Sequence, residues 1–162
     1  MGRVFLGLGS NDRADLLLPW AVGVLCSRFH PLELARPWRG ADVQGRGGAY
    51  ANWVCAFHDG GGLAELQKWC RQLEYDGGSR TESRVPLDLD ILFHEASGAW
   101  HRQALEPYWL AGLAELAPGL MPQGGKSLSE LWVSCQKPAE LRPWQPEFCQ
   151  SDRAQRCPLS AP

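Results

Sequence analysis

The stretch from Arg84 to Phe93, RVPLDLDILF, is rich in apolar residues and is predicted to form a β-strand that carries two carboxylates. Successive side chains of a strand point to opposite faces, so Asp88 and Asp90 share one face while the apolar residues beside them share the other. The two carboxylates would lie roughly 5–7 Å apart. Two carboxylates this close either raise the pKa of one of them, so that it stays protonated, or bind a cation between them. A hard divalent metal such as Mg²⁺, which prefers oxygen ligands, fits such a site best. The alternative is an edge strand with both aspartates facing water.

The length and charge of the chain limit the classes of protein to which it can belong. Its 162 residues suit a single domain with its own core, and its formal net charge of −2 offers no broad basic surface for nucleic acid. No apolar run approaches the ~18 residues of a membrane span, and the N-terminus lacks the pattern of a signal peptide. We therefore expect a soluble, cytoplasmic protein, a monomer or weak homodimer, that binds small molecules and neither nucleic acid nor membranes.

The spacing of cysteines and histidines argues against a zinc site. The six cysteines include no CxxC pair, and the four histidines share no ligand spacing. We expect the cysteines to be mostly reduced and partly buried.

The predicted strands and helices alternate along the chain. Two segments have apolar residues at helical spacing, and short apolar or alternating runs predict four strands. In chain order the elements are a strand at 3–8, a helix at 13–29, strands at 32–35 and 50–57, a helix at 63–75 and the strand at 84–93, followed by helices at 108–116 and 127–133. The β-α-β-β-α-β order predicts an α+β, ferredoxin-like fold with an antiparallel sheet, helices packed on it and extra C-terminal helices.

The connecting segments are less regular. Residues 9–12, Gly-Ser-Asn-Asp, predict a turn that can also cap the first helix. The glycine-rich segment 36–49 predicts a mobile loop rather than a core element. We expect one domain over residues 1–135, followed by an extended or disordered tail over 136–162.

Three short motifs resemble those of the 6-hydroxymethyl-7,8-dihydropterin pyrophosphokinase family. They are FLGLGSN at 5–11, YANWV at 50–54 and LDLDILF at 87–93. They occur in the order and at about the distances seen in that family, and the resemblance covers roughly residues 3–122, including LAELAPGLMP at its end. It implies an ATP-dependent transfer of a diphosphate group to the hydroxymethyl group of 6-hydroxymethyl-7,8-dihydropterin, which releases AMP and serves folate biosynthesis.

The resemblance also implies roles for particular residues. Asp88 and Asp90 match the family's two magnesium ligands, and two arginines would join them in catalysis, Arg80 and Arg84. The pterin would be bound by aromatic, amide and loop residues, namely Tyr50, Asn52, Pro37, Trp38, Arg39 and Tyr108. The co-substrate ATP would be bound by Glu74, Arg80, Arg84, His101 and Arg102.

The chain departs from this family in the cations that bind phosphate. The loop before the aspartates, GGSRTESRVPLD, keeps only Arg80 and Arg84, and Glu106 falls where the family has an arginine. Each lost charge-assisted hydrogen bond would cost roughly 1.5–3 kcal/mol of phosphate binding. Two alternatives to a divergent active enzyme stay open. One is a non-catalytic pterin- or nucleotide-binding relative with a regulatory role, and the other is a ferredoxin-like interaction domain whose aspartates face solvent.

Overall fold

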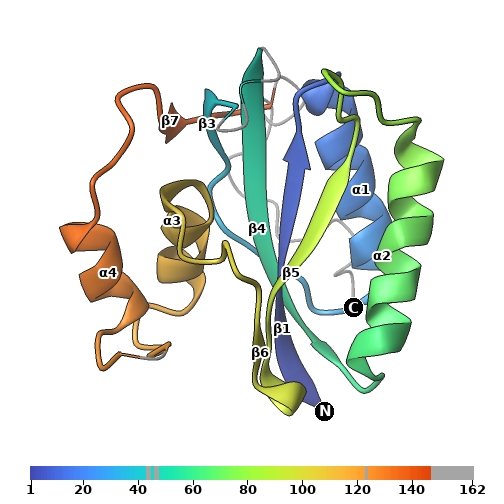
Figure 1. The fold of residues 1–162 in the computed structure, drawn as a ribbon. Coiled ribbons are helices and arrows are strands. Elements are labelled where there is room, and N and C mark those ends of the chain that lie inside the picture. The colour runs from blue at the N-terminus through green and yellow to red at the C-terminus, as the bar shows by residue number, and fades with distance from the viewer. Residues whose placement is uncertain (43–44, 46–47, 123, 147–162) are drawn as a thin grey trace, which may run out of the picture.

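The computed structural model describes residues 1–42, 45, 48–122 and 124–146 of the chain. This part forms an α+β fold in which four α-helices pack on an antiparallel sheet of seven strands (Figure 1). In chain order the elements are β1 (Gly2–Ser10), α1 (Ala14–Arg28), β2 (Glu33–Leu34), β3 (Trp38–Ala41), β4 (Ala49–Asp59), α2 (Leu63–Gly77), β5 (Asp88–His94), the 3₁₀ turn η1 (Glu95–Ser97), β6 (Ala99–Trp100), α3 (Pro107–Leu116), α4 (Leu128–Ser134) and β7 (Arg142–Pro143). The predicted fold class is confirmed, because β1, α1, β2, β4, α2 and β5 follow the expected β-α-β-β-α-β order with only β3 inserted.

The strand β1 lies between β4 and β5 at the centre of the sheet. The strand order is β6-β5-β1-β4-β3-β7, and β2 also pairs with β4. The strand β1 pairs with β4 along its whole length, from Gly2 opposite Asp59 to Ser10 opposite Ala51. The three motifs described above therefore fall on three neighbouring strands, although they are far apart in the sequence.

Different helices cover the two faces of the sheet. Leu6 and Leu8 of β1 belong to the core beneath α1 and α2, whereas Phe5 belongs to the core beneath α3 and α4. Figure 1 shows these two helix layers on opposite sides of the sheet. Gly7 lies on the second face, where an added Cβ would come within 2.7 Å of the Trp109 ring. The helix α3 therefore packs directly on the bare backbone of β1.

The prediction that residues 36–49 form a loop outside the core is wrong for Trp38–Ala41, which forms β3. This strand pairs with the edge of β4, where Trp38 lies opposite Asn52. The Trp38 ring also packs edge-on against Trp132 of α4, with ring centroids 5.4 Å apart. The glycines of the segment favour a loop in a prediction from local sequence. The strand forms because β3 is stabilised by contacts with β4 and α4, which a local pattern does not show.

Parts of two predicted segments lie outside the described residues. These parts are 43–44 and 46–47 of the predicted loop and 147–162 of the predicted tail. In the described part of that tail, β7 pairs with β3, which continues the sheet beyond the predicted domain boundary.

The strand predicted to begin at Arg84 begins at Asp88 instead. Val85 stays outside the sheet because its N–H and C=O are bonded to Asn11 rather than to a neighbouring strand. Pro86 follows and has no N–H to donate, which also delays entry into the sheet. From Asp88 to Ile91 the two faces alternate as predicted, and a register shift against β1 then places both Leu92 and Phe93 in the core beneath α3 and α4.

The described helices include none that is both long and apolar enough to cross a bilayer. Cys55 and Cys70 are buried thiols beneath α1 and α2. Burial raises the pKa of both, that of Cys70 to about 12. These two thiols therefore stay protonated near neutral pH and pack as small apolar residues.

Candidate functional site

A row of paired residues crosses four strands of the sheet. Asp88 of β5 lies opposite Gly9 of β1, and Gly9 lies opposite Asn52 of β4. Asn52 in turn lies opposite Trp38 of β3. Because directly paired residues project to the same face, these side chains share the face that α3 and α4 cover. Three distant parts of the sequence thus meet on one surface.

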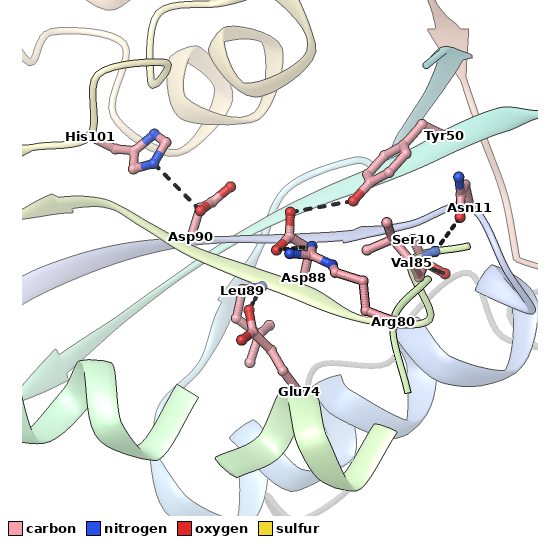
Figure 2. Close-up of polar contacts among 10 residues, drawn as sticks. All are labelled: Ser10, Asn11, Tyr50, Glu74, Arg80, Val85, Asp88, Leu89, Asp90 and His101. Atoms are coloured by element: carbon pink, nitrogen blue, oxygen red, sulfur yellow. Dashed lines mark hydrogen bonds and ion pairs between the residues drawn. The ribbon is translucent and has the colours of Figure 1, made fainter. Parts of the chain in front are cut away.

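Glycines of β1 make room for aromatic rings in the middle of this face. Gly9 separates Asp88 from Asn52 in the row, and Gly7 is the preceding β1 residue on the same face. An added Cβ at Gly9 would come within 2.6 Å of the Tyr50 ring. That ring crosses β1 and places its hydroxyl 3.4 Å from Oδ2 of Asp88, to which it donates (Figure 2). Tyr50 reaches the acidic strand only because β1 has no side chain in its path.

Both carboxylate oxygens of Asp88 are bonded by protein groups. Arg80 donates from Nη2 to Oδ1 at 2.6 Å, while Tyr50 donates to Oδ2 (Figure 2). The Asp88 side chain is 26% exposed and that of Arg80 is 53% exposed, so the ion pair lies at the rim of the site. Water reduces the contribution of such a pair to stability. The main effect of the ion pair is that the positive charge of Arg80 offsets the negative charge of Asp88.

Asp90 lies on the same face as Asp88, as the strand alternation predicts. Its side chain is 27% exposed, and its Oδ1 is 3.5 Å from Nε2 of His101 (Figure 2). Burial raises the pKa of Asp90, repulsion from Asp88 adds to the shift, and nearby basic groups, His101 first, oppose it. A divalent cation between the two carboxylates would act in the opposite direction, because a nearby positive charge favours the ionised form.

Two buried polar atoms of this row have no hydrogen-bond partner within the described part of the chain. They are Oδ1 of Asn52, an acceptor, and Nε1 of Trp38, a donor. Asn52 is only 5% exposed. A buried polar atom that stays unpaired costs about 1–3 kcal/mol, so folded proteins rarely keep one without a functional reason. The pair offers a donor and an acceptor side by side to a planar polar ligand.

Tyr108 brings a second aromatic ring to the site from the first turn of α3. The residue is half-buried, and its ring is tilted against that of Trp109 with centroids 5.5 Å apart. Burial, followed by the charges of Glu106 and Asp90, raises the pKa of Tyr108 to about 12. The Tyr108 hydroxyl therefore stays protonated near neutral pH and lies within the electrostatic field of the acidic pair.

Some predicted site residues are not brought to this face. Arg39 follows Trp38 on β3 and so projects to the opposite face, where its guanidinium lies 5.9 Å from the centre of the Trp144 ring. The carbonyl of Pro37 accepts a hydrogen bond from the backbone N–H of Trp144 at 2.9 Å. Arg84 has an exposed side chain. Arg102 is exposed too, but it lies near the acidic pair, because its charge lowers the pKa of Asp90.

Glu74 approaches β5 from α2, on the opposite side of the sheet from the acidic pair (Figure 2). Its Oε1 accepts a hydrogen bond from the backbone N–H of Leu89 at 2.7 Å. Burial raises the pKa of Glu74, and the bond from Leu89 offsets part of this shift. Glu74 thus binds the backbone of β5, while its implied contact with ATP stays a prediction.

Replacing Glu74 with glutamine should raise the free energy of unfolding at neutral pH. The folded-state pKa of Glu74 lies above its ordinary value of 4.5, so the wild-type protein loses stability as the pH rises through that folded-state pKa. Glutamine keeps an acceptor for Leu89 but carries no charge. Urea unfolding should therefore show a more stable variant at pH 7.5 and equal stabilities well below pH 4.5.

Glu74→Ala is the matched control for this effect, because it removes both the charge and the acceptor. It should be less stable than Glu74→Gln at every pH, since the Leu89 N–H loses its partner. A glutamine variant less stable than the wild type at pH 7.5 would mean that the folded protein stabilises the Glu74 charge.

Ser10 and Asn11 hold the loop that precedes β5. The Asn11 side chain donates to the carbonyl of Ser83 at 3.0 Å and accepts from the N–H of Val85 at 2.7 Å. The Ser10 hydroxyl donates to the carbonyl of Val85 at 3.3 Å. The prediction that this segment caps the first helix is wrong, because α1 is preceded by Arg13, which has a φ of 55° and makes no side-chain cap bond.

Sequence reasoning missed the parts played by Ser10, Asn11 and the two β1 glycines. A signal for the glycines was present, because Gly7 and Gly9 are two residues apart in a strand and so share a face. Glycine at such positions often marks close approach of another group to the backbone. The contacts of Asn11 had no local signal, since its partners lie more than 70 positions away.

The donor atoms of this face fit a magnesium ion that is carried in by a phosphate ligand. Within the described residues, no group of three or more His, Cys, Asp or Glu side chains could hold a metal ion. Mg²⁺ usually binds through one or two carboxylates and completes its shell with water and substrate phosphates. The partly exposed pair of Asp88 and Asp90 matches that requirement.

No model of a known protein family matches the chain, and no curated protein matches it either. Its function is therefore inferred from the geometry of this face and from the three motifs that lie on it.

Proposed function

We propose that the protein is a divergent pyrophosphokinase that transfers diphosphate from ATP to the hydroxymethyl group of 6-hydroxymethyl-7,8-dihydropterin and releases AMP. The observation that carries the proposal is the row from Asp88 across Gly9 to Asn52 and Trp38. It joins a carboxylate pair to an unpaired donor and acceptor across Gly9, over which the Tyr50 ring packs. This arrangement suits a reaction between a metal-bound polyphosphate and a flat heterocycle.

The acidic pair would bind the phosphate half of the reaction. Asp88 and Asp90 would hold Mg²⁺, which when bound neutralises phosphate charge and polarises the phosphoryl oxygens. Around this pair lie the basic side chains of Arg80 and His101. Phosphoryl transfers depend mainly on positioning and electrostatics, and Arg80 would supply positive charge to the phosphates alongside the metal.

The end of the row formed by Asn52 and Trp38, called here the amide end, would bind the pterin. Oδ1 of Asn52 accepts from an amino or ring N–H group, and Nε1 of Trp38 donates to a neighbouring ring acceptor. The rings of Tyr50 and Tyr108 supply aromatic surface on the same face. A pterin bound here would direct its hydroxymethyl group along the row toward the acidic pair.

The proposal is tested by incubating the purified full chain with ATP, Mg²⁺ and 6-hydroxymethyl-7,8-dihydropterin and separating the products. We expect AMP and the pterin diphosphate in equal amounts, each requiring both substrates. The eight tryptophans also report binding, because a stacked pterin should quench their fluorescence. Quenching without AMP would favour the non-catalytic, ligand-binding alternative. An absence of both signals would favour an interaction domain and overturn the proposal.

A further inference from the structure

The bonds of Asp88 conflict with its proposed role as a metal ligand. Arg80 contacts Oδ1 at 2.6 Å, a length typical of a strong charge-assisted bond, and the Tyr50 hydroxyl contacts Oδ2. Each carboxylate oxygen keeps a further lone pair for a metal ion, but a cation bound at Asp88 would lie close to the positively charged guanidinium of Arg80. Repulsion between the two cations therefore favours movement of the Arg80 guanidinium away from Asp88.

The loop that carries Arg80 is held at its backbone. Downstream, Asn11 bonds the carbonyl of Ser83 and the N–H of Val85, and Thr81 bonds the backbone N–H of Arg84. These bonds hold the chain between Arg80 and β5, whereas the Arg80 side chain itself is about half exposed. Rotation of that side chain can thus release Asp88 without breaking the loop.

The cost of displacing Arg80 from Asp88 differs between a free cation and a cation bound to polyphosphate. A cation alone would displace a like-charged guanidinium and leave Arg80 with no anionic partner. A cation that arrives with phosphate brings new hydrogen-bond acceptors for the same guanidinium. The planar guanidinium group matches the geometry of phosphate oxygens as well as that of carboxylate oxygens. The displacement is therefore compensated only when phosphate is present.

We propose that Arg80 makes binding of the divalent cation conditional on the polyphosphate. In the free protein the Arg80 guanidinium is bonded to the Asp88 carboxylate. When the metal–nucleotide complex binds, Arg80 moves to a phosphate oxygen and Asp88 binds the metal. Arg80 is thus a specificity-determining residue that selects the metal–nucleotide complex over the free ion. This role rests on the proposed function of the site.

The test uses the full chain, Mn²⁺ as the probe and isothermal titration calorimetry, with Mn²⁺ alone and with Mn²⁺ plus a non-hydrolysable ATP analogue. Arg80→Ala should bind Mn²⁺ alone about 2- to 10-fold more tightly than the wild type, because the half-exposed guanidinium no longer competes with the cation for Asp88. The same variant should bind the Mn²⁺–nucleotide complex more weakly than the wild type. The two effects therefore have opposite signs.

Two further variants isolate the cause. Arg84→Ala removes an exposed arginine of the same loop, and it should leave the affinity for Mn²⁺ alone unchanged because only Arg80 of these two arginines contacts Asp88 in the described structure. Adding Asp88→Asn to Arg80→Ala should cancel the gain in Mn²⁺ affinity, which would show that the gain acts through that carboxylate. Equal gains in the Arg84 and Arg80 variants would instead reveal a general charge effect and overturn the proposal.

The remaining outcomes are also decisive. Unchanged Mn²⁺ affinity in Arg80→Ala would overturn the proposal, even if the wild type binds the Mn²⁺–nucleotide complex. A gain for Mn²⁺ alone without a loss for the complex would show that Arg80 blocks the metal but does not move to phosphate, and would also overturn it. Failure of the proposed function is separate, because it appears as absence of AMP from wild-type protein that binds the complex.

Discussion

Replacing Asp90 with asparagine is expected to abolish diphosphate transfer while the metal-free protein becomes slightly more stable. The substitution removes one of two carboxylates that would hold Mg²⁺, and a bound metal contributes several kcal/mol to such transfers. Turnover should fall by at least about a hundredfold, since each 1.4 kcal/mol or so is tenfold in rate. Stability rises at pH 7 because burial and repulsion from Asp88 raise the pKa of Asp90, which disfavours its ionised form. That gain should vanish well below the ordinary aspartate value of 3.8.

The corresponding change at Asp88 should separate catalysis from stability. Asp88→Asn should lose turnover to a similar degree, but it also loses the ion pair with Arg80 and should gain no stability. Asp59→Asn is the control, because Asp59 lies at the end of β4 away from the site, opposite Gly2, and this variant should behave as the wild type. Product formation and the thermal midpoint are measured on each variant. Wild-type turnover in either the Asp88 or the Asp90 variant would mean that the pair does not hold the metal.

Replacing Asn52 with alanine is expected to weaken pterin binding by about 1–3 kcal/mol, because a pterin donor group is then buried without a partner. The affinity for the nucleotide should stay nearly unchanged, since Asn52 lies across Gly9 from the acidic strand. The free protein should tolerate the change well, because Oδ1 of Asn52 has no partner to lose among the described residues.

Calorimetry with each ligand separates this effect from damage to β4. Equal losses for pterin and nucleotide would indicate that the strand is disrupted rather than that a specific contact is removed. A Trp38→Phe variant provides a second test, because it keeps an aromatic ring against Trp132 but removes the unpaired Nε1 donor. If neither variant changes pterin affinity, the amide end of the row does not bind the pterin.

Local patterns in the sequence predict the fold class, most of the long elements and the shared face of the acidic pair. These features depend on local spacing: period-two alternation places Asp88 and Asp90 together, and helical periodicity predicts α2 at almost its observed bounds. The motifs on β1, β4 and β5 were also visible as sequence. Their meeting on three adjacent strands follows from the β-α-β-β-α-β order that the same periodicities predict.

The assembly of the site, in contrast, depends on contacts that form when the chain folds. The pairing of Trp38 with Asn52, the passage of Tyr50 over Gly9 and the bonds from Asn11 to the loop before β5 all join residues far apart in the chain. Sheet register sets these contacts, and a shift of one residue would send each side chain to the other face. The bond from Arg80 to Asp88 joins residues close in the chain, but it also depends on tertiary contacts, because Asn11 holds the loop that places the flexible Arg80 side chain. Local sequence patterns carry no record of such distances, which arise only when the strands have paired and the helices have packed.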